Sequence, residues 1–272
     1  MASASSAVSA MLGWYRDQLR QFGLVTATVL LFRVASSRIL VDLANKLLPP
    51  TLSCPCCGWS GRKFYDYIEV GYTVRNAACP RCDSHPKHRQ YFLWLTREYK
   101  LNEKTGVAVI FAPERAFDEV WRNTKDLHVF RVDYETTRDV DAQVDLQQLA
   151  LTTNAADLVW CHQVLEHIED DAAAMRELNR ILRPDTGELV VSVPMTDAAA
   201  TLEYGFADPK ESGHWRIYGD DFVTKLEDSG FKVKKVDFIV PAREAAKFGT
   251  SDEPFYVCRK HVASVQRQDL QN

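Results

Sequence analysis

The sequence predicts an α/β fold in which a mostly parallel sheet of seven strands is flanked by helices. Strand-like and helix-like segments alternate over residues 106–260, and this alternation favours a parallel sheet with helices on both faces. Two close cysteine pairs precede this region, and apolar helical residues precede the pairs. A chain of 272 residues is long enough for one large domain and a smaller unit.

The strand predictions rest on short runs rich in β-branched and aromatic residues. They are Val107–Phe111, Leu127–Val132, a weaker Val140–Val144, Leu158–Cys161, Leu189–Val193, Val233–Val240 and Phe255–Cys258. Helices are expected between them at Ala116–Asn123, Asp171–Leu182 and Asp220–Ser229. Asp170 or Asp171 can cap the second of these helices, Pro184 follows its end, and Gly230 can terminate the third.

Residues 1–50 are expected to form N-terminal helices. The apolar run Phe22–Phe32 ends at Arg33 and is too short to span a bilayer, which needs about 20 apolar residues. Residues 36–48 form an amphipathic helix with Ile39 and Leu43 on its apolar face. We expect this face to pack on the protein's own core or on a second copy in a homodimer. The alternatives are a peripheral membrane contact through residues 11–48 and a transit peptide.

Charge is distributed unevenly along the chain. Residues 1–105 hold 14 Lys/Arg and 7 Asp/Glu, a net charge of +7, whereas the remainder holds 19 and 30, a net charge of −11. The basic part either forms an ordinary solvated surface or meets phosphate, membrane headgroups or an acidic substrate.

Four cysteines predict a zinc-binding module in residues 51–105. Cys54-x2-Cys57 and Cys79-x2-Cys82 are separated by 21 residues, a spacing typical of structural Zn²⁺ sites with four thiolates. Cys56 can replace Cys54 if the register differs, and His85 or His88 offers a substitute ligand. Close pairs and an odd total of seven cysteines favour a reducing compartment, so we expect a cytoplasmic protein. A helix is expected to follow at His88–Lys100.

Two carboxylates follow consecutive predicted strands, as a nucleoside-containing cofactor requires. Asp133 lies 21 residues past Ala112, which is close to the spacing between the phosphate-binding turn and the ribose carboxylate in dinucleotide folds. Asp145 is placed to bind the adenine amino group. The first turn reads Phe111-Ala112-Pro113-Glu114 and contains no glycine, so the usual glycine fingerprint is absent.

Several motifs resemble those of class I S-adenosylmethionine-dependent methyltransferases, of the methyltransferase type 11-like kind. Residues 157–168 (DLVWCHQVLEHI) resemble the segment that follows the fourth strand in that family. Residues 176–184 and 187–194 resemble the next helix and the fifth strand, and residues 214–219 and 230–231 resemble the later region. The resemblance covers residues 51–260 and implies a Rossmann-like fold.

One subgroup of the family is more similar still. It carries two cysteine pairs ahead of the domain, a basic stretch matched by Ser84 and Lys87-His88-Arg89, and Ala-Pro-Glu in place of the glycine turn. The resemblance implies that Ala112, Pro113 and Glu114 line the methionine end of S-adenosylmethionine. It implies further cofactor contacts at Asp133, Asp145, Leu146, Cys161 and His162. Asp185-Thr186 departs from the family's glycine before Gly187.

Methyl transfer sometimes needs a base that deprotonates the acceptor. The catalytic candidates are His214, His162 and His167. We prefer His214, because it follows a loop at residues 206–213 that can cover a substrate.

These observations predict an S-adenosylmethionine-dependent methyltransferase that modifies an O or N atom of a small molecule such as a lipid, sugar or secondary metabolite. One alternative is an RNA methyltransferase that grips phosphate with basic residues of the zinc module, namely Arg62, Lys63, Arg75, Arg81, Lys87 and Arg89. Another is a degenerate methyltransferase fold that binds a partner. The expected domains are residues 1–50, 51–105 and 106–262, followed by a tail at 263–272.

Overall fold

The computed structural model describes residues 4–135 and 140–261, so the expected tail at 263–272 lies outside the described residues. The chain divides into two compact units. The first, which we call the Cys unit, comprises Met1–Tyr99, Arg115–Val120 and Ile239–Asp252. The second, the sheet unit, comprises Lys100–Glu114, Trp121–Phe238 and Glu253–Asn272.

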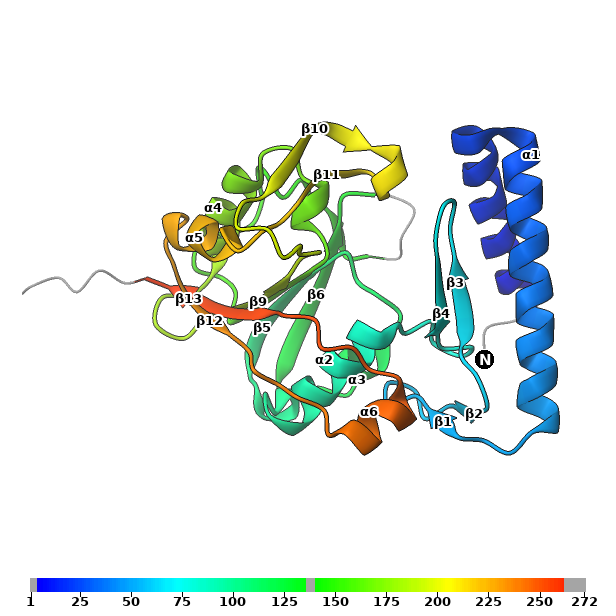
Figure 1. Ribbon diagram of the computed structural model, residues 1–272. Coiled ribbons are helices and arrows are strands. Elements are labelled where there is room, and N and C mark those ends of the chain that lie inside the picture. Colours follow the sequence, from blue (N-terminus) through cyan, green and yellow to red (C-terminus); the bar gives the residue numbers. More distant parts are fainter. Residues whose placement is uncertain (1–3, 136–139, 262–272) are drawn as a thin grey trace, which may run out of the picture. The chain divides into compact units, whose positions relative to one another are not determined.

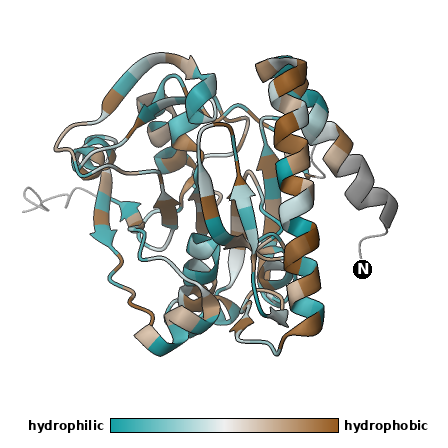
Figure 2. Cartoon of the chain, turned by 45° about the vertical axis from the view of Figure 1, so that its right-hand side comes forward, coloured by the Kyte–Doolittle hydropathy of each residue, from teal (hydrophilic) through white to brown (hydrophobic). Residues whose placement is uncertain are grey.

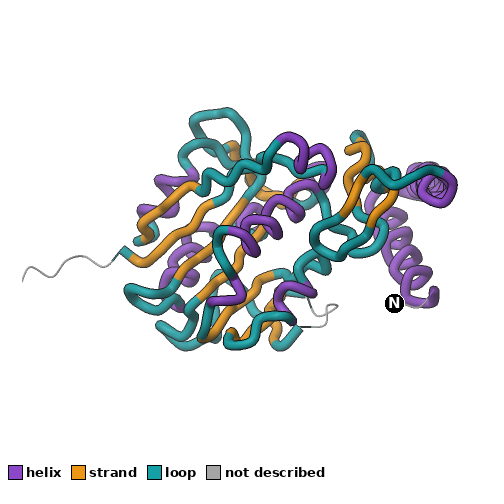
Figure 3. Tube along the Cα trace, turned by 90° about the horizontal axis from the view of Figure 1, so that it is seen from below, coloured by secondary structure: helices purple, strands orange, loops and turns teal. Residues whose placement is uncertain are grey.

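The sheet unit is built on a seven-stranded sheet, which confirms the predicted fold class (Figures 1 and 3). Its strands are β5 (Gly106–Phe111), β6 (Leu127–Asp133), β7 (Ala142–Gln143), β8 (Leu158–His162), β9 (Glu188–Ser192), β12 (Phe231–Lys235) and β13 (Tyr256–Lys260). They lie side by side in the order β12-β13-β9-β8-β5-β6-β7. Strand β13 pairs antiparallel with both of its neighbours, and the other pairs are parallel.

The chain changes direction across the sheet between β5 and β8. From β5 it proceeds outward through β6 to β7, then returns to the other side of β5 and continues through β8 to β9. In open α/β sheets of this kind, ligands bind outside the carboxyl ends of the strands at such a switch point. The topology therefore singles out the ends of β5, β6 and β8.

One face of the sheet packs against α4 (Asp171–Ile181) and α5 (Phe222–Asp228). Alternate strand residues such as Val159 and Cys161 contact the apolar face of α4, where Met175 and Leu178 are fully buried. The predicted caps of these helices are present: Asp170 accepts a hydrogen bond from the Ala173 amide (2.8 Å), and Gly230 adopts a positive φ of 87°.

Several segments differ from the sequence predictions, among them the helices expected at His88–Lys100 and Ala116–Asn123, which run from Pro86 to Arg97 and from Asp118 to Arg122. The strand expected at Val233–Val240 runs from Phe231 to Lys235, and only Ala142–Gln143 of the weak run Val140–Val144 is extended in the sheet. The expected loop at residues 206–213 includes the end of β10 (Leu202–Asp208) and η3 (Pro209–Glu211), and β10 pairs with β11 (His214–Ile217) in a hairpin. Alternating exposure is weak in β10, so the periodicity that reveals a half-buried strand is missing.

Besides the N-terminal helix, the Cys unit contains two small hairpins and two shorter helices. Strands β1 (Leu52–Ser53) and β2 (Ser60–Gly61) form the first hairpin, and β3 (Tyr65–Ile68) and β4 (Thr73–Ala78) form the second. The helices are α2 (Pro86–Arg97) and α6 (Ala242–Phe248). The remaining elements of the chain are α3 (Asp118–Arg122), η1 (Leu101–Glu103) and η2 (Leu165–His167).

Helix α1 (Ala4–Leu47) is broken at Gly23, where the backbone leaves the helical region (φ 79°, ψ 170°). The two halves fold back on each other near this break, where Tyr15 Oη lies 3.0 Å from Thr28 Oγ1, and they diverge farther away (Figures 1 and 2). Only glycine adopts this conformation routinely, so Gly23 permits the helical hairpin. The longer half contacts β3.

Candidate functional site

Three residues come together where β5, β6 and β8 end. In the sheet register, Phe111 of β5 pairs with Val132 on one side and Cys161 on the other. The next residues, Ala112, Asp133 and His162, therefore lie next to one another at the carboxyl edge of the sheet. This edge is the switch point, and all three residues were predicted to bind the cofactor.

The turn after β5 has the backbone of a glycine turn although it contains none. Ala112 adopts a left-handed conformation with φ 46°, and its amide donates to the Val132 carbonyl (2.9 Å). Pro113 and Glu114 follow it and are partly buried. The backbone shape that the missing glycine would provide is thus retained, with some strain at Ala112.

Asp133 ends β6 and is 8% exposed. One oxygen of its carboxylate accepts the Glu135 amide (3.2 Å), and the carbonyl of Asp133 accepts the Val144 amide (2.9 Å). The second contact brings the segment after β7 alongside the end of β6. Asp145 accepts hydrogen bonds from the amide and side chain of Gln147 (2.8 and 3.3 Å), and Leu146 is buried.

The side chains at the end of β8 are held firmly. Cys161 is fully buried in the core that packs on α4, and burial raises the pKa of its thiol, so the thiol remains neutral and behaves as a small apolar group. His162 is 3% exposed, and its two ring nitrogens lie 2.5 Å from Ser192 Oγ and 3.7 Å from a Glu114 carboxylate oxygen. His162 thereby ties the turn after β5 to the end of β9.

The two other candidate histidines lie together beyond β8. His167 belongs to η2 and His214 begins β11, and their rings contact edge to face with centroids 4.7 Å apart. Glu166 adjoins them, and the three residues offer ligand or base atoms within 4.8 Å of one another. His167 is exposed by accessible surface, yet desolvation by its neighbours lowers the pKa of its imidazole more than the Gly213 backbone and Glu135 raise it, so the imidazole is neutral at neutral pH and can accept a proton.

Arg216 fixes the β10–β11 hairpin that carries His214. Its guanidinium is 4% exposed, contacts Glu203 of β10 (2.9 Å), and donates to the backbone carbonyls of Ile168 and Glu169 after η2. An ion pair with Asp171 (3.7 Å) adds a contact to α4. Sequence reasoning missed Arg216 and Ser192, because the partners that give them their roles are distant in sequence.

The predicted metal ligands form one cluster. The Sγ atoms of Cys54 and Cys82 are 3.7 Å apart, as are those of Cys57 and Cys79, and all four lie within 4.8 Å of one another. Cys56 Sγ instead lies 3.9 Å from the carbonyl of His88, so Cys54 occupies the ligand position.

Hydrogen bonds between neighbouring thiols shift the pKa values of the cysteines in this cluster. Hydrogen bonds from neighbouring thiols lower the pKa of Cys54 to about 3 and also lower that of Cys82, whereas the pKa values of Cys57 and Cys79 are raised. Four thiolates this close repel one another unless a cation neutralises them, and a tetrahedral Zn²⁺ provides that charge. The donor set and spacing therefore fit zinc.

Arg89, one of the basic residues suggested for RNA contact, is fully buried. Its guanidinium donates to the carbonyls of Ala77, Ser84 and Gly249 and lies 4.1 Å from the centre of the Phe64 ring. It cannot reach a phosphate, so the expectation of an RNA contact at this residue was wrong. The other members of that basic set are exposed or half-buried.

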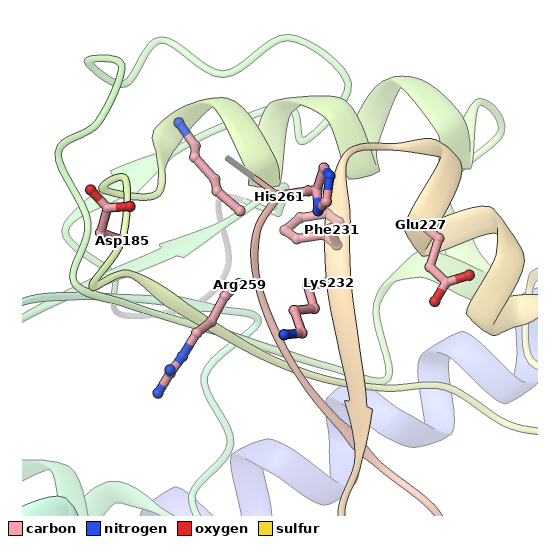
Figure 4. Close-up of a pocket in the computed structure, with 7 residues that line it drawn as sticks. Asp185, Glu227, Phe231, Lys232, Arg259 and His261 are labelled. Carbon is pink, nitrogen blue, oxygen red and sulfur yellow. The ribbon is translucent and has the colours of Figure 1, made fainter. Parts of the chain in front are cut away.

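A separate hollow lies at the opposite end of the sheet (Figure 4). It is lined by Asp185, Glu227, Phe231, Lys232, Arg259, Lys260 and His261. Phe231 begins β12, and Arg259 pairs with Glu188 at the start of β9, so the hollow lies at the amino ends of these strands. Arg259 and Lys260 are already engaged by Glu188 and Asn154, and we assign this hollow no part in the site at the switch point.

Known proteins resemble the chain in part of its length. Residues 130–191 match a family model described as a methyltransferase domain. No curated protein matches the sequence significantly.

The fold resembles several solved structures. An S-adenosylmethionine-dependent methyltransferase from Mesorhizobium loti is 16% identical, with a TM-score of 0.46 over 61% of this chain and 96% of that one. A structure of the Trm112 methyltransferase activator of Haloferax volcanii in complex with a methyltransferase contains a chain that is 17% identical. Its TM-score is 0.45 over 64% of this chain and 94% of that one. The [4+2]-cyclase SpnF is 18% identical, with a TM-score of 0.45 over 55% of this chain. The match covers 60% of the cyclase chain.

The matched residues run from β6 through β8 and α4 to β9. They include Asp133, Cys161 and His162, which the sheet brings to its switch point. The part of the sheet that forms the switch point therefore lies within or beside the segment that matches a methyltransferase domain model.

Proposed function

We propose that this protein transfers the methyl group of S-adenosylmethionine to an O or N atom of a small molecule, such as a lipid, sugar or secondary metabolite. The observation that carries the proposal is the convergence of Ala112, Asp133 and His162 at the switch point. The cofactor supplies a methyl carbon that the sulfonium has already activated, so the protein mainly has to orient and desolvate the reactants.

The proposed position of the cofactor is along the carboxyl edge of the sheet. Asp133 binds the ribose hydroxyls, and Asp145 with Leu146 binds the adenine. Residues Ala112–Glu114 line the methionine end, and Cys161 and His162 border the sulfonium. The burial of Asp133 and Leu146 supports these roles, because a shielded carboxylate forms stronger hydrogen bonds with hydroxyl groups than a solvated one.

His214 is proposed as the general base, with His167 beside it. When bound, S-adenosylmethionine would supply the methyl group to the acceptor O or N atom, and an imidazole of this pair would take up the proton that the acceptor loses. The neutral state of His167 and its contact with His214 support this role. His162 is less suited to be the base, because Ser192 and Glu114 surround both ring nitrogens.

The Cys unit is proposed to bind one structural Zn²⁺ through Cys54, Cys57, Cys79 and Cys82. A site closed by four sulfurs leaves no position for a reactive water, so this zinc has no part in methyl transfer. Thiolate ligands of this kind persist under reducing conditions, which supports a cytoplasmic location.

An RNA acceptor is the second candidate function. The exposure of Arg62, Lys63, Arg75 and Arg81 on the Cys unit favours it. The burial of Arg89 weakens it, and the overall sequence pI of about 6.0 favours a small acceptor. Retention of the protein on RNA that declines steeply with salt would support the RNA candidate.

Calorimetric titration of the zinc-loaded protein with S-adenosylhomocysteine tests the proposed function. We expect micromolar binding that Asp133→Ala weakens at least tenfold, as loss of a charge-assisted hydrogen bond predicts. The matched control is Asp126→Ala, which removes an exposed carboxylate just before the opposite end of β6 and should bind like wild type.

Absence of binding by the wild-type protein would overturn the assignment and favour a degenerate fold that binds a partner. Equal loss in both variants would show that Asp133 has no specific role. Circular dichroism of each variant distinguishes a lost contact from a lost fold.

A further inference from the structure

The longer half of α1 presents an apolar face to solvent. Figure 2 shows hydrophobic residues, in brown, recurring along this helix. Eight large apolar side chains on it are more than half exposed: Leu24, Val25, Val29, Phe32, Ile39, Leu40, Leu43 and Leu47. With 3.6 residues per turn, they fall on one side of the helix over its whole length. So extended an exposed apolar surface is unusual for a soluble monomer.

The opposite side of the same helix already anchors it to the Cys unit. Ala27, Leu30 and Val41 are buried there. Asp42 accepts a hydrogen bond from Tyr65 Oη of β3 (2.6 Å), and Asn45 bonds the backbone of Arg62 and Lys63. The exposed face is therefore not needed to hold α1 in place, and it remains available for another contact.

The composition of the helix argues against a membrane span. By length and composition alone, residues Met11–Leu47 are apolar enough to cross a membrane, and only 17% of their most apolar stretch is buried. However, Gly23 breaks the helix, and Arg33 lies near the middle of the part that remains. A charge at the centre of a bilayer is costly, whereas a helix that lies in the interface keeps such a side chain at the headgroups.

Charge distinguishes a membrane surface from a second copy of the chain. Residues 11–48 hold five Lys/Arg and two Asp/Glu, a net charge of +3. Arg33 and Lys46 are exposed and lie at opposite borders of the apolar face, and Arg33 also donates a long hydrogen bond to Thr73 Oγ1 (3.5 Å). In a twofold dimer through this face the same basic rims would be brought together, which is unfavourable. An anionic lipid surface complements both the apolar face and the rims.

We propose that the exposed face of α1 binds the surface of a membrane that contains anionic lipids, with the helix lying in the plane of the interface. The apolar side chains enter the boundary between headgroups and acyl chains, and Arg33 and Lys46 contact lipid phosphates. This surface is independent of the proposed methyl transfer.

Vesicle flotation of the full-length, zinc-loaded protein tests the proposal. We expect binding to vesicles of phosphatidylcholine with about 30% phosphatidylserine, weaker binding to phosphatidylcholine alone, and partial release by salt. The α1 variant combines Val25→Gln, Phe32→Gln and Leu40→Gln. It should reduce vesicle binding at least tenfold, because these three apolar side chains are exposed. Glutamine is chosen because it preserves the helix. Arg33→Gln with Lys46→Gln should selectively reduce the preference for phosphatidylserine.

Matched variants provide the controls. The control for apolar exposure combines Leu202→Gln, Phe206→Gln and Ile239→Gln, which remove three exposed apolar side chains elsewhere. The control for charge combines Lys232→Gln with Lys234→Gln. Both variants should bind vesicles like wild type. Zinc content and S-adenosylhomocysteine binding report whether each variant is folded.

Two results would overturn the proposal. One is equal vesicle binding by the α1 and control variants, or no binding at all. The other is a dimer in analytical ultracentrifugation that the α1 variant dissociates while vesicle binding stays unchanged.

Discussion

At the scale of single residues, Ala112 shows how the site tolerates an unusual turn. Its φ of 46° lies in a region that costs a residue with a Cβ about 1–2 kcal/mol. Ala112→Gly should remove this strain but loses about 0.4–1 kcal/mol through the more flexible unfolded chain. We therefore expect an unfolding free energy that is unchanged or slightly raised.

Ala112→Val provides the contrast, because a β-branched side chain is strained further at positive φ. We expect it to lower both the unfolding free energy and the affinity for S-adenosylhomocysteine. Chemical denaturation and calorimetry measure the two effects. A valine variant as stable as wild type would show that this turn is not left-handed in solution.

The pH response of His167 is a second prediction at this scale. Its pKa is lowered in the folded protein, so between that pKa and the unfolded value of about 6.5 the unfolded chain binds more protons. Stability should therefore fall as the pH decreases from about 6.5 towards the folded pKa, and it should not change through this group above about 6.5.

NMR titration of the imidazole checks the direction of this shift directly. His167→Gln removes the group, so this variant should lose less stability than wild type over the same acidic range. A folded-state pKa at or above 6.5 would contradict the assignment and would weaken the proposed role of a neutral imidazole beside His214.

At the scale of elements, the β10–β11 hairpin depends on Arg216. Arg216→Ala removes a buried guanidinium that joins Glu203, Asp171 and two backbone carbonyls. Breaking such a network should lower the unfolding free energy by about 2–4 kcal/mol. Arg176→Ala, on the exposed side of α4, should change it by less than about 0.5 kcal/mol.

Hydrogen exchange localises the effect. Amides of residues 202–217 should exchange faster in Arg216→Ala, while those of β5 and β8 in the centre of the sheet keep most of their protection. Uniform loss of protection across the sheet would show that Arg216 supports the whole unit rather than the hairpin.

The elements also show what the sequence could and could not predict. Buried strands such as β8 and β9 stand out as continuous apolar runs, and the apolar spacing of α4 marks its buried face. The hairpin of β10 and β11 was missed because its exposure does not alternate. The carboxylate Asp133 was found by its distance from Ala112, whereas Ser192 contacts His162 only because β8 and β9 are neighbours in the sheet.

At the scale of the whole molecule, the proposed methyl-transfer site, the zinc site and the membrane-binding face lie in different parts of the chain. The match over residues 130–191 belongs to the sheet unit, whereas the Cys cluster and the exposed face of α1 belong to the Cys unit. Methyl transfer, zinc binding and membrane contact are therefore assigned to different sets of residues, and each can be removed by substitution without altering the residues of the others.

Zinc should be required for the Cys unit as a whole. Among the described residues, the buried members of the apolar cluster around the thiols are Phe64 and four cysteines, with Leu52, Trp59 and Phe92 packed against them only in part. So small a core gives little stability by itself, and structural zinc sites supply apparent binding free energies of about 10–16 kcal/mol. We expect one zinc per chain by elemental analysis, and a chelator should unfold the Cys unit and lower the thermal transition of the protein.

Substitution of single cysteines identifies the ligands. Cys54→Ala should lose the bound zinc, because the remaining three thiols leave one tetrahedral position open to water. Cys56→Ala is the matched control: its thiol adjoins Cys54 and Cys82 but is not one of the four sulfurs that lie within 4.8 Å of one another, so this variant should retain one zinc per chain. The reverse result would shift the register of the first pair by two residues, because Cys56 would then occupy the position that the structure gives to Cys54.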